Sequence, residues 1–350
     1  MKTRREFFQT SGALALGAFG CRRSPPTRQL VLQSLVSELV VADLGATLDR
    51  SHALDAAAGA LARAPAPQAL EETRSRWRDA TLAWKQASCF RSGPLVTSGA
   101  LPRALFWPVR PNTLDALLRG REAIDDGTPA RLGVDQKGLF ALEHLLFAPA
   151  PSGALIERAT EAGERGRRLV SVLARAIAGS ARSAADALGD GRAFGVALAN
   201  QGQDGLGLVV NQLVDAVQGA AHRLSPRPRP GGSTPDPRDL EGLPSAMIVP
   251  LVRAAVVGSQ RLYLGTAGRG VTTLVRAISA AIDDRAQGAF TEALSGLDRI
   301  AKLSPAELAG TRPREVTSAT QALVQLQRAL AVDVPGALGL TLVFTGSDND

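Results

Sequence analysis

The chain has 350 residues and a formal net charge of +7, and 45% of its residues are hydrophobic whereas only 4% are aromatic. A core so poor in aromatic residues must be built from closely packed Ala, Leu and Val, which favours helices on helices and argues against a β-sandwich or barrel. The basic residues are interspersed with acidic ones, as in residues 157–168, which is typical of a solvated helix face and argues against a nucleic-acid partner. The length predicts two medium-sized domains.

The first 21 residues have the layout of a twin-arginine export signal. Arg4-Arg5 precede an apolar run from Thr10 to Gly20, which is too short for a permanent membrane span. We therefore expect export to the periplasm or the outer membrane. Residues 18–21 also resemble a lipoprotein processing site, although the usual Leu three residues before Cys21 is absent. Cys21 is then either a lipid anchor on the membrane surface or incidental to ordinary cleavage.

Cysteine and histidine are scarce, which restricts any metal site. The two cysteines are Cys21 and Cys89, so a zinc site with four Cys, or with two Cys and two His, is excluded. The histidines are His52, His144 and His222, and a metal site must therefore depend on carboxylates with one or two imidazoles. We interpret Cys89 as a small buried apolar residue.

Helical periodicity predicts a first helical bundle over residues 28–225. Apolar residues recur at helical spacing from Leu30 to Leu61, and a second helix is predicted from Glu71 to Phe90. Trp77 and Trp84 lie on one face of that helix and are expected to pack against a neighbouring helix. Further helices are predicted at residues 112–120, 137–147, 152–188 and 191–224.

Residues 92–113 interrupt this pattern with repeated Gly and Pro, including Gly93-Pro94 and Trp107-Pro108. The segment also contains apolar residues, among them Leu105 and Phe106, which would not remain in water. We therefore predict an ordered loop that packs on the helices and shapes a site.

A Pro- and Gly-rich stretch at residues 226–238 divides the chain, because its composition forbids a helix or a central strand. We predict a linker there and a second helical bundle over residues 239–350. Its helices are expected at residues 244–264, 268–297, 304–309 and 314–330, with a last segment at 333–345. The predicted fold is all-α, with two helical bundles.

Residues 137–147 resemble the signature helix of the imelysin family, whose pattern is G-x-H-x-x-E followed by an aromatic residue and a Leu-Leu pair. Gly138 and Glu143 match this pattern, and Phe140 stands in the place of the histidine. Residues 83–94, 106–108 and 338–350 resemble other family segments in the same order. The chain is thus similar to a divergent imelysin-like protein, of the iron-regulated protein A type, that lacks the motif histidine.

The resemblance implies an all-α fold of two bundles, a setting in the bacterial envelope and, for many members, a link to iron acquisition. It also implies a site near the signature helix, between the bundles. The family was once classed as metallopeptidases, so the resemblance leaves open whether the chain is an enzyme. The replacement of the motif histidine by Phe140 argues against one.

Glu143 and His144 are the candidate metal ligands. Phe140 cannot bind a metal, whereas His144 lies one turn further along the same helix and could supply the missing imidazole. Alternatively, His144 only packs, and Glu143 forms a structural ion pair with Arg91 or Arg103. The candidate pocket residues are Arg91, Arg103, Trp107, Gly138 and Phe140.

The predicted function is a binding component of envelope iron or metal homeostasis, with no demonstrated catalysis. Its ligand is expected to be iron or another divalent metal, or an iron chelate, with a partner protein in the envelope as a further possibility. Two alternatives stay open: an inactive or atypical metallopeptidase, and a scaffold that binds no ion. A peptidase finds little support, because the chain has no His-Glu-x-x-His motif.

Overall fold

The computed structural model describes residues 26–157, 160–224, 240–304, 307–308 and 314–342. All regular elements within these ranges are helices, and the one β contact there is an isolated bridge between Thr266 and Arg269. The predicted all-α fold is therefore confirmed. The predicted export signal with Cys21, the linker at 226–238 and the last eight residues lie outside the described residues.

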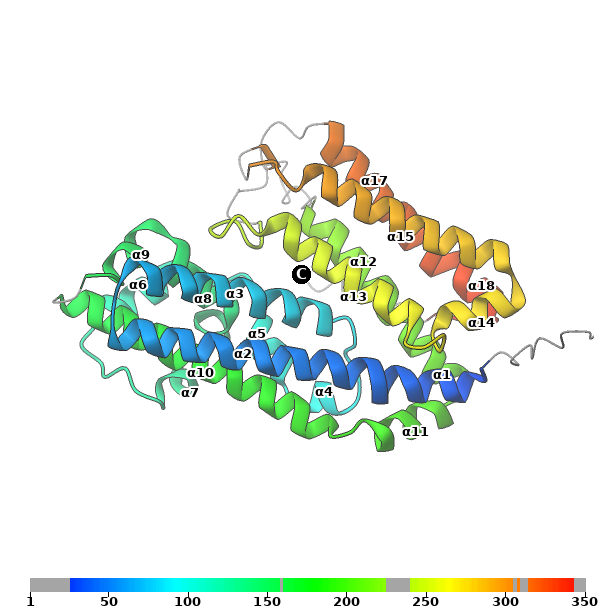
Figure 1. Ribbon diagram of the computed structural model, residues 1–350, viewed down its shortest axis with the longest axis horizontal. Coiled ribbons are helices and arrows are strands. Elements are labelled where there is room, and N and C mark those ends of the chain that lie inside the picture. The colour runs from blue at the N-terminus through cyan, green and yellow to red at the C-terminus, as the bar shows by residue number, and fades with distance from the viewer. Residues whose placement is uncertain (1–25, 158–159, 225–239, 305–306, 309–313, 343–350) are drawn as a thin grey trace, which may run out of the picture.

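Three long helices form the first group: α2 (Val41–Arg63), α3 (Pro67–Ala87) and α10 (Glu161–Leu188). Helix α2 packs against both α3 and α10, as Figure 1 shows. It continues without interruption from α1 (Arg28–Ser34) and a π-helical segment, η1 (Leu35–Val40). The helix predicted from Leu30 is thus one run of three segments.

The run Arg28–Arg63 is long and apolar enough to cross a membrane, judged by length and composition. Half of its most apolar window is buried inside the protein, and Val31 and Leu35 are completely inaccessible to solvent. Because this face packs against other helices, its hydrophobicity is explained by the core.

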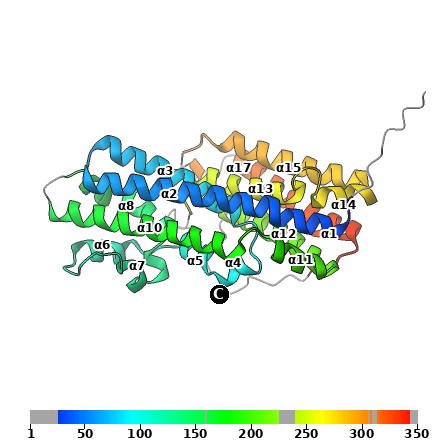
Figure 2. The same ribbon diagram turned by 60° about the horizontal axis from the view of Figure 1, so that its bottom comes forward.

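Four short helices pack against α10 and lie below it in the view of Figure 2. They are α4 (Pro94–Thr97), α5 (Ala100–Leu105), α6 (Pro111–Arg119) and α7 (Thr128–Arg131). A 3₁₀ turn, η2 (Val134–Gln136), leads to α8 (Leu139–Phe147) and α9 (Pro149–Ala154). The predicted loop at 92–113 therefore contains two short helices, and α8 packs against both α3 and α10.

The second group contains four long helices: α12 (Gln203–Leu224), α13 (Ile248–Leu264), α15 (Ala280–Ile300) and α17 (Arg314–Arg328). Shorter elements complete it, namely α14 (Val271–Ile278), the π-helical η4 (Ala329–Asp333) and α18 (Val334–Leu338). Helix α12, which the predicted boundary assigns to the first bundle, packs against α13 and α17. Helix α11 (Arg192–Asn200) packs on α1 instead.

The two groups meet where α3 packs against α13. Gly258 of α13 permits this approach, since a Cβ atom there would lie 2.6 Å from both Cys89 Sγ and the Gln86 carbonyl oxygen. Cys89 itself is 4% exposed, and burial raises the pKa of its thiol to about 12. The prediction that Cys89 is a buried apolar residue is confirmed.

Trp77 and Trp84 are both completely buried, as the predicted packing face requires. Each indole N–H reaches an acceptor: Trp77 donates to the Leu139 carbonyl oxygen at 2.7 Å, and Trp84 donates to Ser51 Oγ at 3.0 Å. A buried indole needs such a partner. The Trp77 contact also anchors the first residue of α8, which carries the candidate site.

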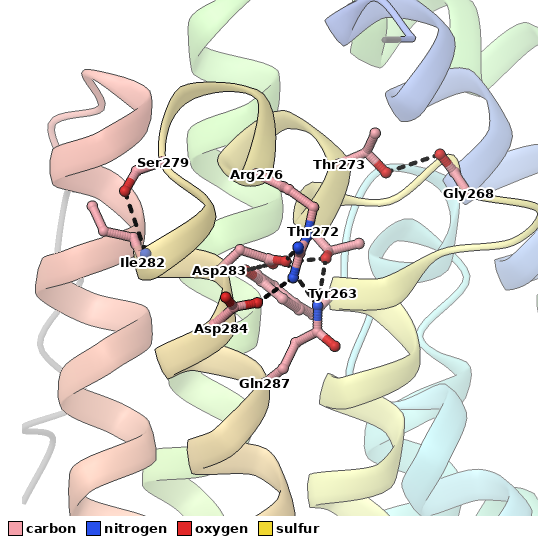
Figure 3. Close-up of polar contacts among 10 residues, drawn as sticks. All are labelled: Tyr263, Gly268, Thr272, Thr273, Arg276, Ser279, Ile282, Asp283, Asp284 and Gln287. Atoms are coloured by element: carbon pink, nitrogen blue, oxygen red, sulfur yellow. Dashed lines mark hydrogen bonds and ion pairs between the residues drawn. The ribbon is translucent and has the colours of Figure 1, made fainter. Parts of the chain in front are cut away.

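A buried carboxylate ties together α13, α14 and α15 (Figure 3). Asp283 is inaccessible to solvent, and its Oδ1 accepts hydrogen bonds from the Tyr263 and Thr272 hydroxyls, each at 2.7 Å. Its Oδ2 accepts from Arg276 Nε at 2.7 Å and Gln287 Nε2 at 2.8 Å. Burial alone would raise the pKa of Asp283, but these four hydrogen bonds together lower it. Asp283 is thus held as a charged structural group.

Candidate functional site

A pocket of about 590 Å³ lies between the two helix groups, and we call it the interface pocket. Apolar side chains and prolines form most of its wall. Three segments line it: residues 107–113 before and at the start of α6, then Phe140, Glu143 and His144 of α8, and finally Leu240, Leu243 and Pro244 before α13.

The residue before α8 is a glycine, because α5 leaves no room there for a side chain. Gly138 has φ +87°, and a Cβ atom there would lie 2.7 Å from the Arg103 carbonyl oxygen and 2.8 Å from that of Ala104. Only glycine tolerates both the positive φ and this approach. Gly138 therefore positions α8, and it lines a different hollow, together with Arg103.

Glu143 is the most deeply buried charged group in the interface pocket, with 3% of its surface exposed. Its Oε1 accepts a hydrogen bond from the Ser245 backbone N–H at 3.1 Å and a second from the Ser245 hydroxyl. No residue within the described ranges donates to Oε2. Burial raises the pKa of Glu143 to about 7, although the Ser245 hydrogen bonds oppose the shift.

The predicted arginine partner of Glu143 is wrong. Arg103 Nη2 donates to the Ser98 carbonyl oxygen at 2.8 Å, and the backbone of Arg91 pairs with Gln212. Arg91 lines two other cavities, beside α12. The donor is instead Ser245, which lies 102 residues further along the chain, in the turn before α13.

A buried ion pair lies behind the pocket wall. Lys85 of α3 and Glu241 are 5% and 3% exposed, and Lys85 Nζ donates to Glu241 Oε1. Arg223 Nε lies 2.6 Å from Glu241 Oε2 without hydrogen-bond geometry, so that contact is a pairing of charges. Burial lowers the pKa of Lys85 to about 8, and the Glu241 charge opposes this shift.

Phe140 is packed against this ion pair. Its ring is 1% exposed, and Lys85 Nζ lies 5.3 Å from the ring centroid, in cation–π geometry. An ammonium group therefore lies against the side chain that occupies the histidine position of the signature pattern. This ammonium already has Glu241 as its anionic partner.

His144 and Glu143 have partners in different segments of the chain. Its Nε2 lies 2.8 Å from Asp115 Oδ1 of α6, and its side chain is 12% exposed. Successive helical residues point about 100° apart, so Glu143 faces Ser245 while His144 faces α6. The two candidate ligands share the pocket but are held by different segments.

The described residues do not fit a resident metal ion. No three His, Cys, Asp or Glu side chains among them form a group that could hold an ion. Glu143 and His144 are two donors with protein partners of their own, and Phe140 supplies none. The metal-ligand assignment of Glu143 and His144 thus stays a prediction.

The interface pocket brings together four of the residues proposed from the sequence, namely Trp107, Phe140, Glu143 and His144. Sequence reasoning missed Ser245, Lys85 and Glu241. Lys85 could have been found, because it lies eight residues after Trp77 and hence on the buried face of α3. Ser245 and Glu241 lie in an irregular turn, where no periodicity marks them.

Comparisons with known proteins agree with this architecture. The family model described as Imelysin matches residues 40–331. A solved structure of a putative iron-regulated protein A precursor from Parabacteroides distasonis is 13% identical, with a TM-score of 0.71 over 90% of this chain and 97% of that one.

A second structure, an imelysin-like protein from Psychrobacter arcticum, is 14% identical, with a TM-score of 0.70 over 91% of this chain and 98% of that one. At such low identities the two structures show a shared fold. Among proteins of curated function, none matches the sequence.

Proposed function

Because the chain belongs to the imelysin family, we propose that it is a binding protein whose ligand occupies the interface pocket. Glu143 carries this proposal. It is a carboxylate with 3% exposure, and one of its oxygens has no donor among the described residues. Because Glu143 lines the interface pocket, a ligand bound there could donate a hydrogen bond to that oxygen.

Binding is favoured over peptide hydrolysis by the side chains that surround Glu143. A metallopeptidase needs a metal held by about three protein ligands, and the described residues bring no such group together. The wall of the interface pocket is mostly apolar, with few polar groups, which is typical of small-molecule sites. The proposed ligand is therefore a small organic molecule or a metal chelate.

The proposed setting is the cell envelope, in iron or metal homeostasis. One protein of the same fold is named a putative iron-regulated protein A precursor. Export is supported by Arg4-Arg5 and the apolar run after them. Lipidation of Cys21 would tether the binding protein to a membrane surface, where it could meet a partner protein.

The test is analysis of what co-purifies with the protein from the periplasm, without a His-tag. Native mass spectrometry detects organic ligands, and elemental analysis detects metals. We expect wild type to retain a small molecule that Glu143→Gln loses, whereas His52→Ala, a change at an exposed histidine, retains it.

A stoichiometric metal ion without an organic ligand, lost in Glu143→Gln and in His144→Ala, would instead establish these two residues as metal ligands. A wild-type protein that carries neither metal nor small molecule, even after exposure to periplasmic extract, would contradict the proposal and favour the scaffold alternative.

A further inference from the structure

We infer that the ligand of the interface pocket carries a protonated amine on an apolar body, and that this amine donates to Glu143 Oε2. This inference rests on the proposed function and narrows the class of ligand. It is carried by three features of the pocket: the unshared carboxylate oxygen, the apolar wall, and the way neighbouring charges are already paired.

The unshared oxygen is available to a hydrogen-bond donor in the pocket. Both Ser245 hydrogen bonds reach Oε1 of Glu143, so Oε1 is saturated while Oε2 receives nothing from the described residues. Glu143 lines the pocket, which gives a bound molecule access to Oε2. Charge-assisted hydrogen bonds are stronger than neutral ones, so an ammonium is the donor that gains most there.

Neighbouring cations do not meet this need. Lys85 and Arg223 both pair with Glu241, and no described cation lies within ion-pair distance of Glu143. Arg110 at the pocket rim has a side chain that is 76% exposed, and it pairs with Asp135 at 3.0 Å. Glu143 is therefore the buried charge around the pocket that a cationic ligand would neutralise.

The walls suit an apolar body. Trp107, Pro108 and Pro111 line the pocket from the segment before α6 and its first residue, and Leu240, Leu243 and Pro244 line it from the turn before α13. These side chains offer no charge and few polar atoms to a ligand. The indole of Trp107 also favours a nearby cation through its ring quadrupole. An anionic ligand would meet the Glu143 carboxylate in a desolvated site, which is unfavourable.

The inference predicts a pH dependence. Because burial raises the pKa of Glu143 to about 7, its carboxylate accepts an ammonium fully only above neutral pH. The groups that face Glu143 are Ser245, which does not titrate, and the Lys85–Glu241 pair, with the His144–Asp115 pair beside it. Amine binding should strengthen between pH 6 and pH 8, while binding of a neutral alcohol should not.

The experiment compares three probes that share one apolar body: hexylamine, hexan-1-ol and hexanoate. Each is titrated calorimetrically into the mature full-length protein at pH 8. We expect hexylamine to bind about tenfold more tightly than hexan-1-ol, in line with one charge-assisted hydrogen bond, and hexanoate to bind most weakly.

Glu143→Gln should remove the preference for the amine, because its amide can still accept from Ser245 but turns an N–H toward the pocket. Binding of hexan-1-ol should change by less than about twofold, since the apolar contacts are kept. His52→Ala serves as the matched control and should leave all three affinities unchanged. If Glu143→Gln fails to fold, the order of the three affinities in wild type tests the same point.

Equal affinities for amine and alcohol would overturn the inference while leaving the pocket as a binding site. A preference for hexanoate, or no binding of hexylamine at millimolar concentration, would also overturn it. The proposed function fails by a different result, namely the absence of any ligand or metal after exposure to periplasmic extract, so the two failures are distinguishable.

Discussion

Asp283 and Glu143 are both carboxylates buried in helical surroundings, yet their environments differ sharply. Asp283 receives four hydrogen bonds, two at each oxygen, and its pKa is lowered despite burial. From the residues that the structure describes, Glu143 receives two hydrogen bonds at a single oxygen, and burial raises its pKa to about 7. The number of donors at each oxygen thus separates a structural carboxylate from one that is available to a ligand.

The difference follows from where the donors come from. Tyr263, Thr272, Arg276 and Gln287 all lie within 20 residues of Asp283, inside one helix group. The donor to Glu143 lies 102 residues away, across the junction of the two groups. Ligand pockets occur preferentially at such junctions, and shifted pKa values cluster at functional sites.

The largest expected change in stability comes from breaking the Lys85–Glu241 ion pair behind the pocket. Glu241→Ala should lower the free energy of unfolding by about 3–5 kcal/mol, because Lys85 is left buried without an anionic partner. Urea denaturation at pH 7 measures the loss. The double variant Lys85→Met/Glu241→Leu should lose much less, since it removes both charges. A double variant as unstable as Glu241→Ala would show that the pair is needed for packing.

A smaller loss of stability is expected when Asp283, whose hydrogen bonds are satisfied, is replaced. Asp283→Asn should cost about 2–3 kcal/mol at pH 7, because an amide cannot accept all four hydrogen bonds. The control is Asp284→Asn, at a side chain that is 63% exposed, with an expected loss below about 1 kcal/mol.

The pH dependence of the Asp283→Asn effect follows from its lowered pKa. Asp283 contributes stability that is present above its ordinary pKa of 3.8 and is lost as the pH falls through the folded-state pKa. The difference between wild type and Asp283→Asn should therefore shrink in acid. An effect that is constant down to pH 2 would show that the charge of Asp283 is unimportant.

Glu143→Gln should change the free energy of unfolding in the opposite direction and stabilise the protein. The pKa of Glu143 is raised from 4.5 to about 7, so its contribution is fully present below pH 4.5 and is lost as the pH rises through 7. Removal of the charge should raise the free energy of unfolding by about 2 kcal/mol at pH 8, and by little at pH 5. Denaturation at the two pH values measures it. A loss of stability at pH 8 would mean that Glu143, like Asp283, is structural.

The smallest effect is expected at His144. The Asp115 side chain that pairs with it is 32% exposed, so Asp115→Asn should change the free energy of unfolding by less than about 1 kcal/mol. Thermal denaturation at pH 7 is sufficient to measure it. A loss above about 2 kcal/mol would show that the His144–Asp115 pair is structural, as Asp283 is.

Sequence patterns predicted much of the fold and part of the site. The apolar period revealed the helix from Arg28 to Arg63, and Trp77 and Trp84 were correctly placed on a buried face. The signature segment led to Glu143, and the apolar loop led to Trp107. These features are local, since a helix repeats every 3.6 residues and its buried face can be read within a few turns.

Only the tertiary structure decided what surrounds Glu143. Ser245 and Glu241 lie in the irregular turn before α13, and Ser245 donates from there to Glu143 of α8. Lys85 pairs with Glu241 and lies over the Phe140 ring, whereas Arg91 and Arg103 have other surroundings. The sequence by itself determined the helices and the residues on their buried faces. The pairing of charges across the junction depended on contacts between distant segments, and no local period encodes those contacts.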